Sequence, residues 1–315
     1  MFHKILLNIL LMLTAASLAA PSAVFAVQNC VMPPDGMVGW WPGDGNANDI
    51  VGGDNGILQG GAAFGTGIVG QAFQLNGSTN YVEVPDSQSL DVSTAITIQA
   101  WVYINAFPTY PSPPTGLNMQ VFQKTSNQTL QAYSLVILGD GGIYAGYESP
   151  DNPYGAGTLQ PRKFGLELTV DGQWAIGRWS NTELQEHTWY HLVTTYDGSV
   201  VKVYLNGQLD ASSPLTGEIE INDKPAAIGA FGFTNGGPTF DYFNGTIDEV
   251  QIFNRALSAS EIAAAYNAGS AGNCKVSTPL VAADCKKGGW QALTRADSSP
   301  FKNQGDCIQY VNTGK

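Results

Sequence analysis

The stretch Asn244-Gly-Thr-Ile-Asp-Glu-Val-Gln-Ile-Phe-Asn-Arg-Ala-Leu-Ser-Ala-Ser-Glu-Ile262 combines a turn, a strand and the start of a helix. Its first two residues are a hairpin turn signal, and the apolar residues from Ile247 to Phe253 predict a strand that is buried on much of both faces. Ser258 and, three residues later, Glu261 form a capping-box pattern, which predicts a short helix ending near Gly269. We therefore expect the domain to finish with a strand followed by a short helix.

The chain upstream of this stretch alternates between short apolar runs and glycine-containing turns. Between residues 40 and 253 the runs are separated by Asn-Gly, Asp-Gly and Gly-Gly pairs, which are typical of an all-β sandwich. In residues 97–104 every second residue is apolar on one face, whereas Gln99, Trp101 and Tyr103 fall on the other face. This alternation predicts a strand with one face in the core and the other free to hold aromatic side chains.

Residues 244–262 resemble the closing segment of laminin-G-like domains in the concanavalin A-like lectin/glucanase group, whose last core strand reads roughly G-x-I-D-E-V-x-I-x-N-R-A-L-S-x-x-E-I. The Asp- and Asn-rich loop at 43–49 follows an apolar strand, as at the opening of such domains. Residues 189–196 and 201–207 are similar to two of their middle strands. The resemblance covers about residues 37–268 and implies an all-β jelly roll of two antiparallel sheets, with a short helix after the last core strand.

The sequence also predicts how the chain is divided. Lys4 precedes the apolar run of residues 5–13, and the segment ending at Ala26 satisfies the small-residue rule for signal peptidase, which predicts export. No run approaches the roughly 20 apolar residues that a membrane span needs, so no membrane insertion is expected. The expected parts are a signal peptide at residues 1–26, the sandwich at 27–274, a linker at 275–284 and a small disulfide-closed element at 285–315.

Four cysteines remain after the predicted cleavage: Cys30, Cys274, Cys285 and Cys307. Export favours disulfides over metal thiolates, and three pairings are possible. The resemblance implies Cys30 with Cys274, because these residues flank the laminin-G-like region and the first and last strands of a jelly roll are commonly neighbours. Cys285 with Cys307 then closes a small loop. The final element resembles a short module of secreted bacterial proteins, so we expect a secreted or extracellular protein, with the periplasm and the cell surface as alternatives.

The charge balance restricts the partners. Without Lys4 the chain has 13 basic against 26 acidic side chains. Such a surface repels nucleic acid and anionic membranes, because both are bound mainly by neutralising phosphate with Lys and Arg. An acidic excess on an exported β-protein instead suits divalent cations or neutral glycans. The sequence leaves the oligomeric state open.

The loop Asp44-Gly-Asn46-Ala-Asn48-Asp49 places oxygen-bearing side chains in a glycine-containing segment, and calcium uses ligands of this type. Similar jelly rolls commonly hold one calcium ion near such a loop. The resemblance therefore implies a structural calcium held by Asp44, Asn46 and Asp49, with Asp248 from the closing strand. The alternative is that the loop residues form Asx turns and that Asp248 caps backbone amides.

A hydrolytic function has less support in the sequence. Sandwich glucanases of the group that this chain resembles use a strand motif E-x-D-x-x-E, whose alternate carboxylates face one cleft. The nearest match, Glu218-Ile-Glu220-Ile-Asn-Asp223, lacks the third carboxylate at the required offset. Asp248 and Glu249 are adjacent, so the strand period of two predicts that they point to opposite faces. Glycoside hydrolysis is therefore the least favoured alternative.

Aromatic side chains near polar ones are the candidates for sugar contacts, because aromatic faces offer flat apolar surface while amides and carboxylates fix the ligand's orientation. We expect a non-catalytic module that recognises carbohydrate or a glycan-bearing surface. The alternative is a protein-binding adhesion or envelope module. The candidate ligand-binding residues are Tyr144, Tyr147, Tyr154, Trp174, Trp179, Phe231, Phe233 and Tyr242.

Overall fold

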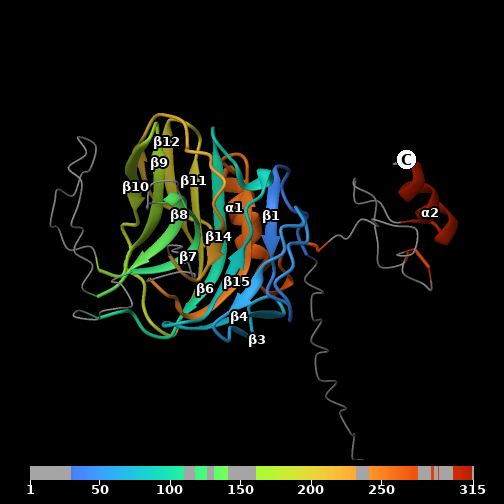
Figure 1. The fold of residues 1–315 in the computed structure, drawn as a ribbon, viewed down its shortest axis with the longest axis horizontal. Coiled ribbons are helices and arrows are strands. Elements are labelled where there is room, and N and C mark those ends of the chain that lie inside the picture. The colour runs from blue at the N-terminus through green and yellow to red at the C-terminus, as the bar shows by residue number, and fades with distance from the viewer. Residues whose placement is uncertain are drawn as a thin grey trace, which may run out of the picture.

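The computed structural model forms two antiparallel β-sheets packed face to face (Figure 1). The residues that it describes are 30–109, 118–125, 131–140, 161–231, 241–275, 285–286, 290 and 301–313. Within these residues, every pairing between two named strands is antiparallel. The predicted all-β sandwich is therefore confirmed.

The first sheet has eight strands in the described part of the chain. Its hydrogen-bonded order is β13, β12, β11, β6, β15, β4 and β3, and β1 pairs with β15. In Figure 1, the blue β1 and the orange β15 therefore lie side by side, although they come from opposite ends of the sandwich sequence. The bounds are β1 Met37–Trp41, β3 Ala63–Thr66, β4 Gln71–Asn76, β6 Ile96–Ile104, β11 Trp189–Tyr196, β12 Val200–Leu205, β13 Gln208–Pro214 and β15 Asn244–Phe253.

The second sheet has seven strands, counted over the same described residues. Its order is β10, β9, β8, β7, β14, β5 and β2. The strand bounds are β2 Ile57–Gln59, β5 Tyr81–Val84, β7 Asn118–Thr125, β8 Gln131–Leu138, β9 Phe164–Val170, β10 Gln173–Trp179 and β14 Ala226–Ile228. The helices are α1 Ala259–Ala268 and α2 Gln304–Thr313, and the short 3-10 turns are η1 Gln88–Leu90 and η2 Gly269–Ala271.

The core lies between the two sheets and follows from the alternation in the sequence. The four alternate residues from Ile98 to Ile104 of β6 are buried in it, as predicted, and Leu135 of β8 and Leu166 of β9 belong to the same apolar cluster. Removing such side chains from water is the main favourable term in folding. The outer face of β6 carries Trp101 and Tyr103, which leaves that face available for other contacts.

Helix α1 follows β15 as predicted and packs on the outer face of the eight-stranded sheet. Ser258 is its N-cap, since its side chain accepts a hydrogen bond from the Glu261 N–H while the Glu261 carboxylate accepts one from the Ser258 N–H. Leu257 and Ile262 pack with Phe253 in a small apolar cluster. The predicted capping box therefore fixes where the helix begins, and its apolar residues fix which surface it covers.

Strand β15 contains a β-bulge that the sequence pattern missed. Its register on β6 shifts between Asp248 and Gln251, and Glu249 has a positive φ of 55°. Ile247 and Val250 both belong to the core, so the two residues between them, Asp248 and Glu249, lie on the outer face. The expectation that these carboxylates point to opposite faces is therefore wrong, because a bulge adds a residue and interrupts the period of two.

Two disulfides form as expected, Cys30–Cys274 and Cys285–Cys307. The first joins the two ends of the sandwich, and the second lies in a small apolar cluster with Phe301. The predicted signal peptide and all but the first residue of the predicted linker lie outside the described residues. Within the described ranges, no helix is long and apolar enough to cross a membrane.

Candidate functional site

The Asp49 carboxylate organises the opening loop. Asp49 is buried, and its Oδ1 accepts hydrogen bonds from the N–H groups of Trp40 and Val51 at 2.8 and 2.9 Å. Its Oδ2 accepts from the N–H groups of Gly52 and Asp54 at 3.0 and 3.1 Å. Four backbone donors therefore use both oxygens, and the side chain ties the end of β1 to the loop that follows it.

Asp44 and Asn46 also make contacts within the chain. The Asn46 side-chain oxygen accepts a hydrogen bond from the Asn48 N–H at 2.9 Å, which is an Asx turn. Asp44 Oδ1 accepts one from the Gln71 N–H at 2.8 Å, and Asp44 Oδ2 pairs with the Lys275 ammonium at 2.5 Å. These side chains thus hold the opening loop against the start of β4 and against the end of the sandwich.

Asp248 caps the loop before β4. Its Oδ2 accepts hydrogen bonds from the N–H groups of Ile68 and Val69 at 2.7 and 2.9 Å. The other oxygen, Oδ1, is buried and has no hydrogen-bond partner among the described residues. Burial raises the pKa of Asp248 to about 8, although the Val69 N–H opposes this shift. The residue therefore acts as a backbone cap, with one oxygen left over.

Glu249 lies beside Asp248 and is paired at both oxygens. Its Oε2 accepts a hydrogen bond from Trp40 Nε1 at 2.7 Å, and its Oε1 lies 2.7 Å from Lys275 Nζ. Burial raises the pKa of Glu249, and the Lys275 ammonium partly offsets that shift. Because Lys275 also contacts Asp44, a single ammonium joins the opening loop to the bulge of the closing strand.

Three of the four residues predicted to bind calcium have their side-chain oxygens engaged within the chain, and only Asp248 keeps an oxygen without a partner among the described residues. The described part of the chain contains no group of three or more His, Cys, Asp or Glu side chains that could hold a metal ion. Asp44 and Asp49 use both carboxylate oxygens, and Asn46 uses its carbonyl oxygen, on partners within the chain. The positive charge beside Asp44 is supplied by Lys275. Calcium stays a prediction of the resemblance, to be tested by chelation.

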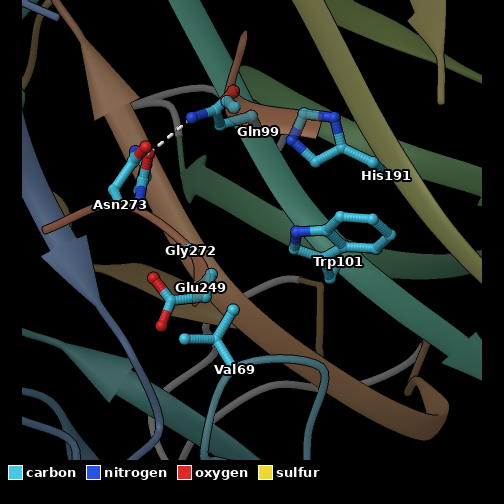
Figure 2. A pocket seen from close by; sticks show the side chains of 9 residues that line it. Val69, Gln99, Trp101, His191, Glu249, Gly272 and Asn273 are labelled. Atoms are coloured by element: carbon cyan, nitrogen blue, oxygen red, sulfur yellow. Dashed lines mark hydrogen bonds between the residues drawn. The ribbon is translucent and has the colours of Figure 1, made fainter. Parts of the chain in front are cut away.

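A small polar cavity lies under α1, on the outer face of the eight-stranded sheet (Figure 2). Trp101, His191 and Glu249 face it, and its volume of about 10 Å³ is close to the space of one water molecule. Tyr266 of α1 stacks on Trp101 with ring centroids 5.6 Å apart, and the Trp101 and His191 rings are 5.0 Å apart. Burial lowers the pKa of His191 to about 3, so the ring is neutral. The cavity is too small for a sugar.

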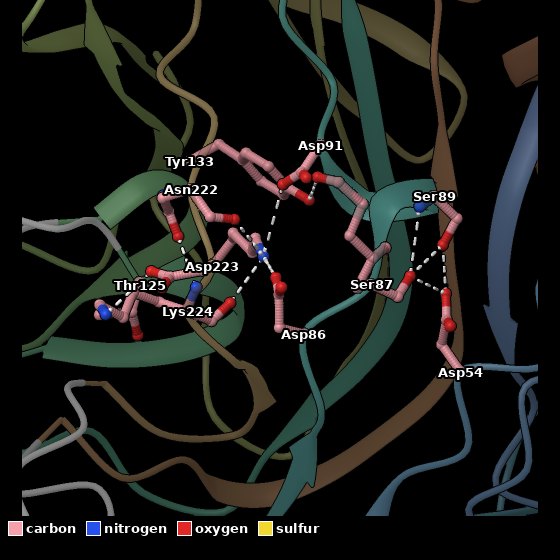
Figure 3. A network of polar contacts seen from close by, with 12 residues as sticks. Asp54, Asp86, Ser87, Ser89, Asp91, Thr125, Tyr133, Asn222, Asp223 and Lys224 are labelled. Carbon is pink, nitrogen blue, oxygen red and sulfur yellow. Dashed lines mark hydrogen bonds and ion pairs between the residues drawn. The ribbon is translucent and has the colours of Figure 1, made fainter.

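A second polar cluster surrounds Lys124, which is almost fully buried (Figure 3). Its ammonium pairs with Asp86, lies 3.7 Å from Asp91 Oδ1, and donates to the backbone oxygens of Asn222 and Lys224. A buried ammonium needs such partners, because an unpaired charge in the interior is costly. The cluster thus joins the segment that follows β5 to the segment that precedes β14, and its role is to stabilise the fold.

The predicted aromatic residues fall into three groups. Trp179 and Phe231 are buried, at 2% and 9% exposed, whereas Trp174 and Tyr242 are partly exposed. Tyr242 lines a hollow of about 220 Å³ at one end of the sandwich. The remaining candidates lie outside the described residues: Tyr144, Tyr147, Tyr154 and Phe233.

A larger hollow, lined by described residues, lies on the outer face of the eight-stranded sheet, away from α1. We call it the amide groove; its volume is about 500 Å³. None of the side chains that line it carries a charge. The lining residues are Gly61, Ala63, Gln74, Leu75, Asn76, Asn80, Tyr103, Asn105, Gly245 and Thr246.

Tyr103 brings an aromatic ring to the amide groove. Its ring centroid lies 5.6 Å from that of Trp189 on β11, and both side chains are partly exposed. Tyr103 and Trp189 face each other in the strand register, one step along from Trp101 and His191. The alternation in residues 97–104 predicts that Tyr103 lies on the outer face, but no sequence pattern indicates that Gln74 and Asn105 lie beside it.

The fold and the amide groove together define a class of protein: a jelly-roll sandwich with an open, uncharged hollow on one outer face. Residues 76–263 match the family model of the Concanavalin A-like lectin/glucanases superfamily. The chain belongs to this family, as its closing segment predicted. No curated protein matches the sequence significantly.

Solved structures with a similar fold include binding domains. Domain 4 of AbnA, a GH43 extracellular arabinanase from Geobacillus stearothermophilus, was solved with arabinotriose; it has a TM-score of 0.51 and 20% identity, over 72% of this chain and 96% of that one. The binding domain of Paraclostridial Mosquitocidal Protein 1 has a TM-score of 0.52 and 15% identity, over 74% of this chain and 52% of that one. The binding domain of botulinum neurotoxin DC, solved in complex with rat synaptotagmin II, has a TM-score of 0.51 and 14% identity, over 78% of this chain and 53% of that one. The chain spans about half of these two toxin domains, and the likeness shows the fold.

Proposed function

We propose that this protein is a non-catalytic module that binds carbohydrate in the amide groove. The observation that carries the proposal is the absence of charge among the described groove-lining residues, in a chain with 26 acidic and 14 basic side chains. Neutral sugars offer hydroxyl groups and flat apolar patches. Side-chain amides both donate to and accept from hydroxyls, and the face of Tyr103 offers a stacking surface.

Two amides of the groove remain for a ligand. Asn76 is occupied, since its side-chain oxygen accepts from the N–H groups of residues 78–80, and Asn80 donates to the Gly60 carbonyl. Gln74 and Asn105 are exposed and make no side-chain hydrogen bond within the described ranges. Asn76 and Asn80 therefore shape the wall, and Gln74 and Asn105 are the groups that would bind hydroxyls beside Tyr103.

The similar structures support a binding role. The arabinanase domain was solved with arabinotriose, a neutral oligosaccharide, and this chain covers nearly the whole of that domain. A glycoside hydrolase would need two carboxylates roughly 5 to 10 Å apart in one cleft. Among the described residues that line the amide groove, none is a carboxylate. The groove is therefore suited to binding without bond cleavage.

A protein-binding adhesion or envelope module is the second candidate. Ile57 and Leu58 on the edge strand β2 are 51% and 38% exposed, and Ile50 and Val51 in the preceding loop are exposed as well. Exposed apolar side chains near a sheet edge suit contact with another protein. The toxin domain solved with synaptotagmin adds support for this role. These residues are separate from the amide groove, so the two functions can be tested separately.

The proposed location is extracellular, with residues 1–26 removed. Both disulfides support it, because disulfides persist in oxidising compartments. Mass spectrometry of the protein exported by its host would test the proposal. Recovery from the medium or cell surface with Val27 at the N-terminus is expected, whereas an intact residue 1 on cytoplasmic protein would contradict it.

The binding proposal is tested on an array of neutral and anionic glycans, with Tyr103→Ala and Gln74→Ala as the test variants. We expect selective binding of neutral glycans, weakened about fivefold by Tyr103→Ala, since a well-placed aromatic contact contributes on the order of 1 kcal/mol. Tyr103→Phe retains the ring and Gln208→Ala removes an exposed glutamine at the far edge of the same sheet, so both should bind as the wild type does. No glycan binding, or binding that both test variants leave unchanged, would refute the proposal.

A further inference from the structure

A second hollow adjoins the amide groove across a narrow rim. We call it the Tyr242 hollow; its volume is about 220 Å³, and Tyr242, Phe107 and Pro108 line it. The two hollows meet at three pairs of consecutive residues, 76–77, 105–106 and 244–245, with one member of each pair in each hollow. The described residues that line the Tyr242 hollow are uncharged, like those of the amide groove.

Backbone hydrogen bonds hold together the segments that form the rim between the hollows. The Asn105 N–H donates to the Asn244 carbonyl at 3.0 Å, and the Gly77 N–H donates to the Phe243 carbonyl at 2.9 Å. Three of the six rim residues, Gly77, Ala106 and Gly245, have little or no side chain, and the other three are asparagines, a residue type whose amide can bind hydroxyls. Gly245 is required there, since its φ is 151° and a Cβ atom would lie 2.0 Å from the Tyr103 carbonyl oxygen.

Each side of the rim has a partly exposed tyrosine. Tyr103 lies in the amide groove, and Tyr242 lies in the second hollow, where its ring is 6.4 Å from that of Tyr81. Asn105 and Thr109 are exposed and add polar groups on the two sides. The arrangement therefore repeats one recognition element, an aromatic ring beside polar uncharged groups, on both sides of a rim that a chain can cross.

We infer that the two hollows form one extended site for an unbranched neutral oligosaccharide, which crosses the rim and contacts Tyr103 and Tyr242 on its two sides. This inference rests on the proposed carbohydrate binding and adds the ligand class: a linear chain bound along its length. A monosaccharide or a chain terminus fills only one hollow. Affinity must therefore rise with chain length until the ligand spans the rim.

The test is calorimetric titration with arabino-, xylo-, cello- and malto-oligosaccharides, from the monosaccharide to about the hexasaccharide. The quantity measured is the ratio of long-chain to short-chain affinity. We expect a ratio of about ten for the wild type in the preferred series, and a ratio near one for Tyr242→Ala, because the second aromatic contact is lost. Tyr242→Phe keeps the ring and should keep the ratio.

A second variant makes the test independent of Tyr242. Ala106→Leu raises the rim, so it should also bring the ratio toward one, and thermal unfolding of each variant checks that it folds. A ratio that neither Tyr242→Ala nor Ala106→Leu changes would overturn the extended site while leaving the amide groove in place. Loss of all neutral-glycan binding in the wild type would instead overturn the proposed function, and with it this inference.

Discussion

Two neighbouring pairs of rings on the outer face of the eight-stranded sheet differ in exposure: one pair is buried and the other is partly exposed. Trp101 and His191 face each other on β6 and β11, and Tyr103 and Trp189 do so one step further along the same strands. Tyr266 of α1 stacks on the first pair and buries it, whereas the second pair remains partly exposed beside the amide groove. The reach of one short helix thus decides which aromatic pair is structural and which can meet a ligand.

The covered pair and the open pair differ most in their surroundings. Under α1 the remaining space is about 10 Å³, and burial lowers the pKa of His191 to about 3. Beside Tyr103 the hollow measures about 500 Å³. Strand pattern and residue type are alike in the two places, so the difference lies in tertiary packing.

Truncating one tryptophan from each pair should give the largest contrast in stability. Trp101→Ala removes a buried ring that contacts Tyr266 and His191, and we expect the free energy of unfolding to fall by about 3–5 kcal/mol. Trp189→Ala removes a partly exposed ring, and about 1 kcal/mol is expected. Denaturant unfolding measures both. Equal losses for the two variants would show that α1 does not separate the pairs.

Acid sensitivity should be specific to the covered pair. Burial holds the pKa of His191 near 3, below the 6.5 of a free histidine, so the unfolded chain binds the extra proton between these values. The stability that neutral His191 contributes is therefore full above pH ~6.5 and is lost as the pH falls toward ~3. We expect the drop in unfolding free energy between pH ~6.5 and ~4.5 to be smaller by about 2 kcal/mol in His191→Asn.

The matched control for this pH measurement is His187→Asn, at an exposed histidine near Tyr103. Glu249 lines the same cavity as His191 and remains in every variant, so its own titration largely cancels in the comparison. If His187→Asn flattened the pH dependence as much as His191→Asn did, the covered ring would not be its source.

Weakening the N-cap of α1 should expose the covered pair of rings, Trp101 and His191, more often, and so make it more like the open pair. Ser258→Ala removes the side chain that accepts from the Glu261 N–H, and the loss of such a cap costs about 1 kcal/mol. We expect faster amide hydrogen exchange in α1 and at Trp101, with little change at Tyr103. Ser258→Asn keeps a side chain that can cap the helix, so it serves as the control. Uniformly faster exchange over both strands would indicate global destabilisation instead.

Chelation should have the smallest effect. The described arrangement joins Asp44 to Glu249 through the Lys275 ammonium, so we expect EDTA to leave the midpoint of thermal unfolding unchanged and glycan binding intact. The calcium implied by the family resemblance predicts the contrary, a lower midpoint that added Ca²⁺ restores. A shift of several degrees would therefore support calcium and would mean that the ion displaces Lys275.

Much of the fold could be predicted because its signals are local. The alternation in residues 97–104 fixes which face of β6 enters the core, and the pair Ser258 and Glu261 fixes the start of α1. The bulge at Glu249 escaped prediction, since nothing in the residue types of Asp248 and Glu249 marks an extra residue in the ladder. One such residue was enough to place two carboxylates on the same face.

The candidate site could be predicted only in part, because its residues are far apart in the sequence and come together only through the pairing of the strands. The amide groove joins segments near residues 61, 74–80, 103–105 and 245, which approach one another only when the sheet forms. Aromatic residue type did not separate core from surface either: Trp179 proved to be buried. Residue type also did not reveal that both carboxylate oxygens of Asp49 accept hydrogen bonds from backbone N–H groups, and the calcium site stays a prediction.

The Cys30–Cys274 disulfide has a mechanical consequence. It links residues that are 244 positions apart, at the start and the end of the sandwich. A pulling force between a point before Cys30 and a point after Cys274 runs through this covalent link and bypasses every strand between them. Such a load would extend the terminal segments and leave the strands between the two cysteines unloaded until the disulfide is reduced.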